Sequence, residues 1–178
     1  MKHNRRNFIQ LTSLAAAPIL AGSRAVAAPK EQPNILLIVT DQQHAAAIAA
    51  LGNPHLSTPA MDELVKNGMS FRRSYTTNPV CSPARSSLFT GRASSETGVY
   101  KNGTTIRDDI PKIGQWLGSN GNYDCVYAGK WHLKRSYDDT IPGFRVLHTG
   151  MGGMGSVCDT AVSMSCASYI LNRPKKAP

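Results

Sequence analysis

Apolar runs along the chain, separated by glycines and prolines, predict where the strands lie. Residues 34–41 are apolar almost without interruption up to Asp41, which is typical of a parallel strand buried on both faces. Residues 123–128 form a second, shorter run, and residues 69–76 are predicted to form a strand as well. We therefore expect three strands, the first of them in the interior of a sheet.

Three other segments, residues 58–68, 111–121 and 159–171, have the apolar spacing and the end signals of helices. In the first of them, Thr58 is placed to cap the helix and Gly68 to end it. The first two helices are expected to turn these side chains toward the core: Met61, Leu64, Val65, Ile113, Trp116 and Leu117.

A fourth helix is predicted between Pro83, which suits the first helical position, and Gly91, which suits the position after the last. Cys81 would then lie at the mouth of the helix, where free backbone N–H groups and the helix dipole favour an anion. Arg85, about one turn further on, can direct its guanidinium to the same place. A nucleophile and an anion site would thus share one turn. The alternative is a buried, inert cysteine beside a surface arginine.

Two further places carry polar side chains with possible chemistry. Asp41 and Gln42 follow the first predicted strand, and ligands of open α/β sheets bind beyond the carboxyl ends of strands, so both could offer oxygen atoms to a metal ion. Capping of the next helix is the alternative for Asp41. Lys130 and His132 follow the second apolar run, and in an extended segment both point to one side, with Trp131 on the other. Solvated loop side chains are the alternative for this pair.

Residues 1–28 have the three parts of an export signal. The twin arginines at positions 5 and 6 are followed by an apolar stretch, residues 11–21, that is too short to cross a membrane. Small residues then allow cleavage before Ala28. We therefore expect a twin-arginine-type signal peptide at 1–28 and a body at 29–178. The twin-arginine export machinery would be a partner, and the protein would be periplasmic or secreted, with no stable membrane span.

Charge and cysteine content narrow the classes of partner. The net charge of +9 falls to +5 without the four basic residues of the signal, which leaves 16 Lys and Arg against 11 Asp and Glu. That balance suits an anionic substrate, but no basic run with interleaved aromatic residues indicates nucleic acid. The four cysteines form no recognisable disulfide framework or zinc site, and the last two would be about 12 Å apart along one helix.

Several of these motifs together resemble the type I sulfatases of the alkaline-phosphatase-like superfamily. The first is Cys-x-Pro-x-Arg at residues 81–85, and the second is Gly-Lys-Trp-His at residues 129–132. Pro-Asn-Ile at residues 33–35, followed by Asp-Gln at residues 41–42, also fits the family. The resemblance covers about residues 34–144. It implies an α/β fold in which a mostly parallel sheet is flanked by helices.

The resemblance also implies a function and roles for the site residues. Cys81 would be oxidised by a formylglycine-generating enzyme to the aldehyde formylglycine. Arg85 and Lys130 would stabilise the charge of a sulfate-ester substrate, and His132 would contact the hydrated aldehyde. The chain is thus expected to be a sulfuric ester hydrolase.

A metal site is implied as well, and this chain carries only part of it. Asp41 and Gln42, together with residue 81, would hold one divalent cation, which is expected to be calcium because the ligands are oxygens. Type I sulfatases are considerably longer and take further metal ligands from their later part, and none of these is present. We therefore expect the chain to be the amino-terminal portion of a sulfatase that turns over poorly or not at all.

Alternatives from other classes remain open. A phosphodiester or phosphonate monoester hydrolase of the same superfamily could share the formylglycine, and the chain could also be a non-catalytic remnant. A dinucleotide-binding protein is not expected. Residues 150–155 match Gly-x-Gly-x-x-Gly, but no acidic residue follows Asp159 to bind a ribose, so this segment is interpreted as a flexible loop.

Overall fold

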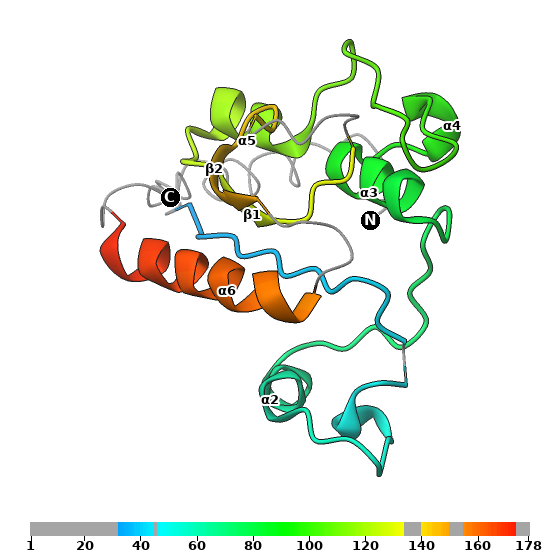
Figure 1. Ribbon diagram of the computed structural model, residues 1–178, viewed down its shortest axis with the longest axis vertical. Helices are drawn as coiled ribbons and strands as arrows, with labels where there is room; N and C mark the ends of the chain where they lie inside the picture. The colour runs from blue at the N-terminus through cyan, green and yellow to red at the C-terminus, as the bar shows by residue number, and fades with distance from the viewer. Residues whose placement is uncertain (1–31, 45, 134–139, 150–154, 174–178) are drawn as a thin grey trace, which may run out of the picture. The chain divides into compact units, whose positions relative to one another are not determined.

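The computed structural model describes residues 32–44, 46–133, 140–149 and 155–173. Every helix and strand named below lies within residues 35–178 (Figure 1). The predicted signal peptide at 1–28 and residues 150–154 of the predicted loop lie outside the described residues. Both therefore remain predictions.

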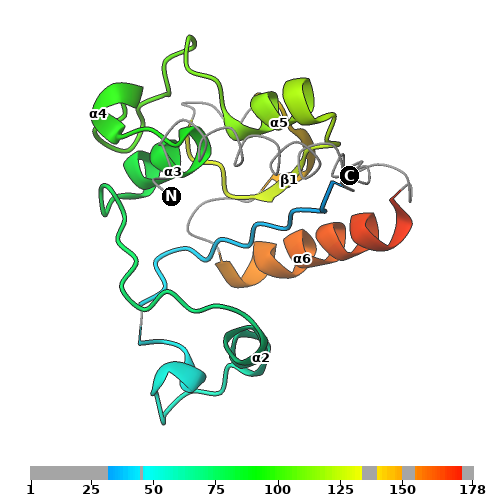
Figure 2. The same ribbon diagram turned by 180° about the vertical axis from the view of Figure 1, so that it is seen from behind.

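The sheet has two parallel strands, β1 (Val126–Gly129) and β2 (Arg145–Thr149). Their register has one irregularity, after Tyr127. The long helix α6 (Gly155–Asn172) packs against both strands (Figure 2). The predicted strand at 123–128 and the last predicted helix are thus confirmed.

Five shorter helical elements come before the sheet in the sequence: η1 (Ala49–Leu51), α2 (Pro59–Asn67), α3 (Cys81–Thr90), α4 (Ser94–Thr97) and α5 (Ile113–Gly121). Helix α3 packs against α4 and α5, and α2 packs against η1. Thr58 and Gly68 flank α2 as predicted. The hydroxyl of Thr58, however, donates to the carboxylate of Asp62 and accepts from the N–H of Ala49, and it caps no N–H of α2.

The predicted inward faces of α2 and α5 are partly wrong. Leu64 is 67% exposed and Trp116 is 58% exposed, so both lie mainly in solvent. In α5 the buried residue is Gly114, and a Cβ atom there would lie 2.5 Å from the ring of Phe144. This helix therefore turns a glycine toward its neighbour, and the aromatic ring fills the space that a larger side chain would need.

Two of the predicted strands do not form. Residues 32–40 have no strand partner among the described residues, and residues 69–76 are irregular apart from a turn at residues 72 and 73. The apolar side chains at positions 35–39 are 44–70% exposed. A strand is held by hydrogen bonds to a neighbouring strand, so an apolar run alone does not produce one.

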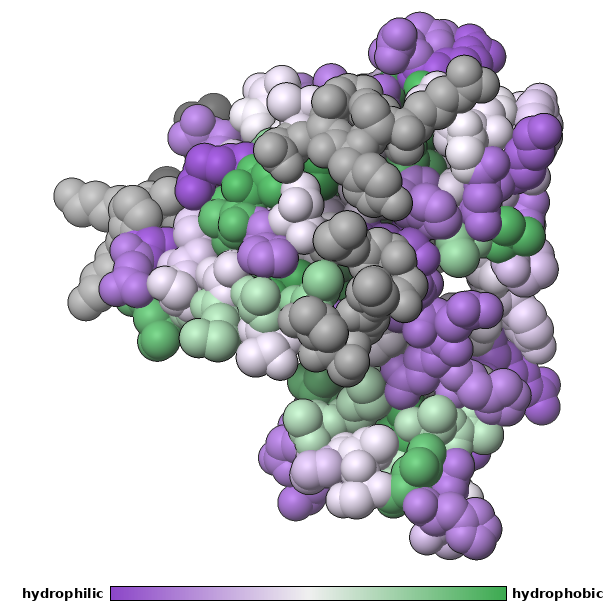
Figure 3. Space-filling view, in the orientation of Figure 1, coloured by the Kyte–Doolittle hydropathy of each residue, from purple (hydrophilic) through white to green (hydrophobic). Residues whose placement is uncertain are grey.

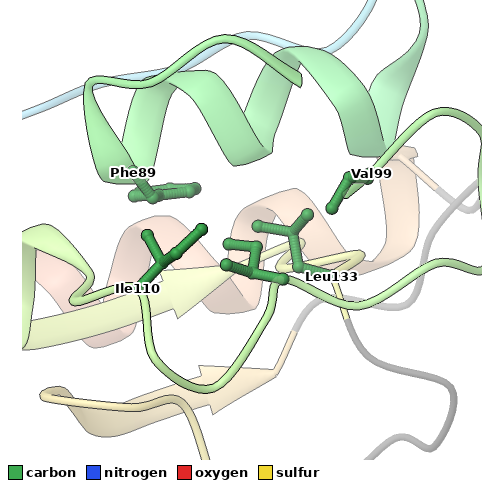
Figure 4. Close-up of a cluster of buried hydrophobic side chains, with 5 residues drawn as sticks. Phe89, Val99, Ile110 and Leu133 are labelled. Atoms are coloured by element: carbon green, nitrogen blue, oxygen red, sulfur yellow. The ribbon is translucent and has the colours of Figure 1, made fainter. Parts of the chain in front are cut away.

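The hydrophobic core lies between α3 and the segments that follow it (Figure 4). It consists of these buried side chains: Phe89, Val99, Ile106, Ile110 and Leu133. The ring of Phe89 lies 4.7 Å from that of Trp131 and 5.9 Å from that of Tyr127, measured between centroids. These contacts hold α3 against β1 and against the segment that follows β1, with Trp131 on the core side as predicted.

Large apolar side chains also remain at the surface, where they are mixed with polar residues on the face in Figure 3. None of the helices in the described ranges is long and apolar enough to cross a membrane. All four cysteines are free, and Cys158 and Cys166 both lie on α6.

Candidate active site

Helix α3 begins at Cys81, two residues earlier than predicted, so that Pro83 is its third residue. A proline is tolerated there because the first four N–H groups of a helix have no partner within the helix. Gly91 follows the last residue with φ +67°, a left-handed conformation that glycine adopts without strain, as predicted. The half-buried Cys81 therefore lies in the first turn of a well-ended helix.

Arg85 lies one turn further along α3 and is only 8% exposed. Its Nη1 donates a hydrogen bond to the carbonyl oxygen of Lys130, and its Nη2 lies 3.9 Å from Oδ1 of Asp41. The alternative of a surface arginine is therefore wrong. A buried guanidinium that is held by a carbonyl has its position fixed before any ligand binds.

Lys130 connects the cysteine to the acid. Its Nζ lies 2.7 Å from Oδ2 of Asp41 and 3.9 Å from Sγ of Cys81, and its side chain is only 18% exposed. The hydrogen bond from Lys130 is the main cause that lowers the pKa of Asp41, against a smaller opposing effect of burial. The acid is therefore a carboxylate at neutral pH, and it holds the ammonium group beside Cys81.

His132 has φ +57°, a left-handed conformation that is uncommon for a residue other than glycine. Partial burial lowers the pKa of His132, the charges of Lys130 and Arg85 lower it further, and Asp41 opposes them. The ring is therefore neutral at pH 7 and lies within range of all three charges. The structure thus brings Asp41, Arg85, Lys130 and His132 together around Cys81.

Gln42 is not part of this cluster. Its side chain is exposed, its φ is +49°, and the described contacts include none between Gln42 and the cluster residues. The alternative role of Asp41 as a helix cap is not seen either, because Ile48 precedes the next helix, η1.

Main-chain donors contribute less to the cluster than the sequence suggested. Pro83 has no N–H group to offer. The N–H of Ser82 donates to Oδ1 of Asn102 at 2.9 Å, and that of Ala84 donates to a carbonyl of the preceding turn. Cationic side chains therefore supply most of the positive charge beside Cys81.

The model of the sulfatase family matches residues 33–164, which is most of the chain. The chain belongs to the sulfatase family. The matched range includes every residue of the cluster.

An ulvan-active sulfatase from Formosa agariphila is 38% identical to this sulfatase chain over 104 residues. The alignment covers 58% of this chain and 21% of the relative. The chain thus spans about a fifth of the length of this curated relative.

Two solved structures share the fold. The crystal structure of Ps i-CgsB has a TM-score of 0.60 at 32% identity, over 67% of this chain and 29% of that chain. The phosphonate monoester hydrolase of Agrobacterium radiobacter has a TM-score of 0.58 at 22% identity, over 81% of this chain and 30% of that chain. They confirm the predicted fold class, an α/β fold of the alkaline-phosphatase type of which this sulfatase chain holds a part. At its low identity the second likeness concerns the fold alone.

The sulfatase family generally uses a formylglycine and a divalent metal ion, and the described residues provide only part of such a metal site. No three of their His, Cys, Asp or Glu side chains form a group that could hold a metal ion. The carboxylate of Asp41 is bound by Lys130, whereas calcium takes six to eight oxygen ligands. The described residues alone therefore do not fit a complete calcium site, and the assignment of a metal to Asp41, Gln42 and Cys81 stays a prediction.

Three residues that hold the cluster together were missed by the sequence analysis. Ser82 donates from its hydroxyl to the carbonyl oxygen of His132 at 2.6 Å, and its N–H is bound by Asn102. Tyr127 donates from its hydroxyl to the carbonyl oxygen of Lys130 at 2.7 Å. Ser82 stands inside the Cys-x-Pro-x-Arg motif, but its burial shows only in the structure, so no signal in the sequence indicated this contact.

Proposed function

We propose that this chain carries the nucleophile and the sulfate-binding cations of a sulfatase, which hydrolyses sulfate esters, and that Cys81 is the precursor of its formylglycine. One observation carries the proposal. The Sγ atom of Cys81, on the first residue of α3, lies 3.9 Å from Nζ of Lys130, and Arg85 is held beside the same ion pair. A nucleophile beside one fixed cation, with a second cation held at the same carboxylate, suits an anionic group that is attacked at its central atom.

The Sγ atom of Cys81 stands where the aldehyde made by a formylglycine-generating enzyme would lie. When hydrated, this aldehyde would supply one hydroxyl that attacks the sulfur of a sulfate ester and displaces its alcohol, and a second whose loss of a proton would expel sulfate and restore the aldehyde. Arg85 and Lys130 would bind the sulfate oxygens and stabilise their charge during transfer. His132, neutral at pH 7 because its pKa is lowered, can accept a proton at this place.

We also propose that the chain contributes to the binding of a divalent cation. Asp41 and Gln42 offer the oxygen donors that calcium prefers, and the family generally uses a divalent metal. Titration of the purified chain with calcium in a calorimeter tests this point. Calcium binding that Asp41→Asn removes would support the site. If the chain binds no calcium, Asp41 and Gln42 are not a sufficient site.

Mass spectrometry of the tryptic peptide at residues 74–85 tests the conversion of Cys81 directly. The chain is produced together with a formylglycine-generating enzyme, and we expect an aldehyde in this peptide that reacts with a hydrazide. The peptide at residues 113–130 carries Cys125 and serves as a control within the same digest, where the thiol should persist. An intact thiol at Cys81, under conditions where the host converts another sulfatase, contradicts the proposal.

Turnover of an aryl sulfate tests the reaction class. We expect at most slow hydrolysis by the converted chain, because the metal site that its described residues provide is incomplete, and any hydrolysis should be absent in Cys81→Ala. Parallel measurement with an aryl phosphonate addresses the alternative hydrolase, for which the structural likeness supports the fold alone. Preference for the phosphonate would replace the sulfatase proposal, and no turnover of either would favour a non-catalytic remnant.

Export is proposed on the sequence of residues 1–28. If the twin-arginine route carries this protein to the periplasm or beyond, the exported form should begin at Ala28. Replacement of both Arg5 and Arg6 by lysine should leave it in the cytoplasm, which cell fractionation measures. Unchanged export of that variant would contradict the twin-arginine route.

A further inference from the structure

We propose that Ser82 is a positioning residue that fixes the main chain at His132 relative to residue 81. The meaning of this role for catalysis rests on the proposed function, whereas the contact that creates it does not. Ser82 directly follows Cys81 on α3 and is fully buried. Its hydroxyl donates a hydrogen bond of 2.6 Å to the carbonyl oxygen of His132, fifty positions further along the chain.

The conformation of His132 gives this hydrogen bond its importance. A φ of +57° is unfavourable for a histidine, so the surrounding structure has to hold it there. Trp131 packs on Phe89 on one side, and Leu133 is buried in the core on the other. These apolar contacts anchor the neighbours of His132, but only the Ser82 bond fixes the direction of its carbonyl among the contacts described.

Ser82 acts on His132 more than on Lys130. The carbonyl oxygen of Lys130 has two donors of its own, Arg85 and Tyr127, and neither depends on the Ser82 hydroxyl. Loss of that hydroxyl should therefore release His132 while the two cations stay in place. For the proposed reaction, turnover should then fall while substrate binding persists.

Ser82 is itself held from the other side. Its N–H donates to Oδ1 of Asn102 at 2.9 Å, and this bond joins the first turn of α3 to the loop after α4. Ser82 thus links the loop that contains Asn102 to the segment that contains His132, and it is adjacent in sequence to Cys81.

The test compares Ser82→Ala with Ser86→Ala. Ser86 lies one turn further along α3, is equally buried, and bonds the carbonyl of Pro83 at 2.8 Å and the hydroxyl of Thr97 at 2.9 Å, away from His132. Both variants remove one buried hydroxyl from the same helix. General loosening of the fold should therefore appear in both, whereas a positioning effect should appear only in Ser82→Ala.

The first measurement is nuclear magnetic resonance of the full chain labelled selectively at its five histidines. In Ser82→Ala the backbone amide and Cα signals of His132 should shift away from the values of a left-handed conformation, and the other histidines should keep theirs. In Ser86→Ala the signals of His132 should not move. Unchanged His132 signals in a folded Ser82→Ala protein would overturn the proposal.

The second measurement is the turnover of an aryl sulfate by the converted chain. Ser82→Ala should lower kcat by about 10- to 100-fold with KM within about twofold. In a His132→Ala background the same substitution should change kcat by less than about twofold, because a residue that acts through His132 has nothing left to position. Additive effects of the two substitutions, or an unchanged kcat, would overturn the proposal.

If Ser82→Ala does not fold, Ser82→Cys replaces it, since the thiol has a similar size and is a much weaker donor. Both substitutions leave the Cys-x-Pro-x-Arg pattern intact. Displaced His132 signals in a chain whose parent hydrolyses no sulfate ester would support the contact and overturn the sulfatase function. The two failures are therefore distinguishable.

Discussion

Residues 35–40 and helix α3 both lead to the cluster around Cys81, but they are held in different ways. The apolar side chains at 35–39 remain 44–70% exposed, and no strand pairs with them among the described residues. In α3, by contrast, Phe89 is 3% exposed, and Arg85 is bound to the carbonyl of Lys130. Packing therefore positions Arg85, whereas the described contacts that hold Asp41 are its ion pairs with Arg85 and Lys130. The two halves of one site differ in how firmly they are built.

The largest expected effect of this difference is on stability. Phe89→Ala should lower the free energy of unfolding by about 3–5 kcal/mol, because it removes a buried ring from contact with Trp131 and Tyr127. Urea unfolding followed by circular dichroism measures the change. Leu36→Ala is the matched control, with an expected effect of about 0.5 kcal/mol or less, since Leu36 is exposed. Equal losses in the two variants would remove the distinction between the regions.

The second largest effect is expected on catalysis, from the loss of the guanidinium of Arg85. Arg85→Met should lower kcat/KM for an aryl sulfate by about 10²- to 10³-fold, because the charge that would stabilise the transferring group is lost. Steady-state kinetics of the converted chain provides the measurement. Arg73→Met removes an exposed arginine and should leave kcat/KM unchanged. A loss of less than about tenfold for Arg85→Met would show that its guanidinium does not act on the substrate.

A smaller effect should reveal how weakly Asp41 is held. The pKa of Asp41 is lowered by Lys130, so its ion pair stabilises the fold above the ordinary value of 3.8 and is lost as the pH falls through the lowered pKa. Lys130→Met should therefore cost about 1 kcal/mol or less at pH 7, because the carboxylate is 44% exposed to screening solvent. Urea unfolding between pH 7 and pH 3 measures the difference in the free energy of unfolding between the parent and Lys130→Met. This difference should become smaller below pH 3.8. A constant difference would mean that the variant acts through something other than the ion pair.

The smallest effect is expected from His132. Its pKa is lowered below the ordinary value of 6.5, so the unfolded chain binds the proton more readily and stability falls as the pH drops below 6.5. The burial of His132 is only partial, so this loss should amount to about a few tenths of a kcal/mol. His132→Gln should remove it, as measured by thermal unfolding between pH 7.5 and pH 5. A variant with the same pH dependence as the parent would show that another group titrates.

Local signals predicted the parts of the fold that depend on nearby residues. Gly91 and Gly68 end their helices as predicted, because the end of a helix is decided by the conformation of one or two residues. The cluster around Cys81 was predicted from two motifs that carry their side chains on a helix start and a strand end. The sequence predicted that these charged groups lie together, as they do in the structure. It did not predict that Arg85 donates to the carbonyl oxygen of Lys130.

The features that failed depend on distant neighbours. The run at 34–41 is as apolar as a buried strand, yet its pairing depends on another strand, which local composition does not encode. In α5 the position of Trp116 followed from spacing, whereas the ring of Phe144 selected Gly114 as the buried residue. The hydrogen bond from Ser82 spans fifty positions, and no pattern along the chain announces it.

The burial of Pro83 and Arg85 has a consequence for the order of events during synthesis. If the enzyme of the proposed conversion of Cys81 has to contact both side chains, it would have to act while this stretch is still unfolded. Oxidation would then have to precede packing of the helix, and a protein purified with its thiol intact would need to be unfolded before it could be matured.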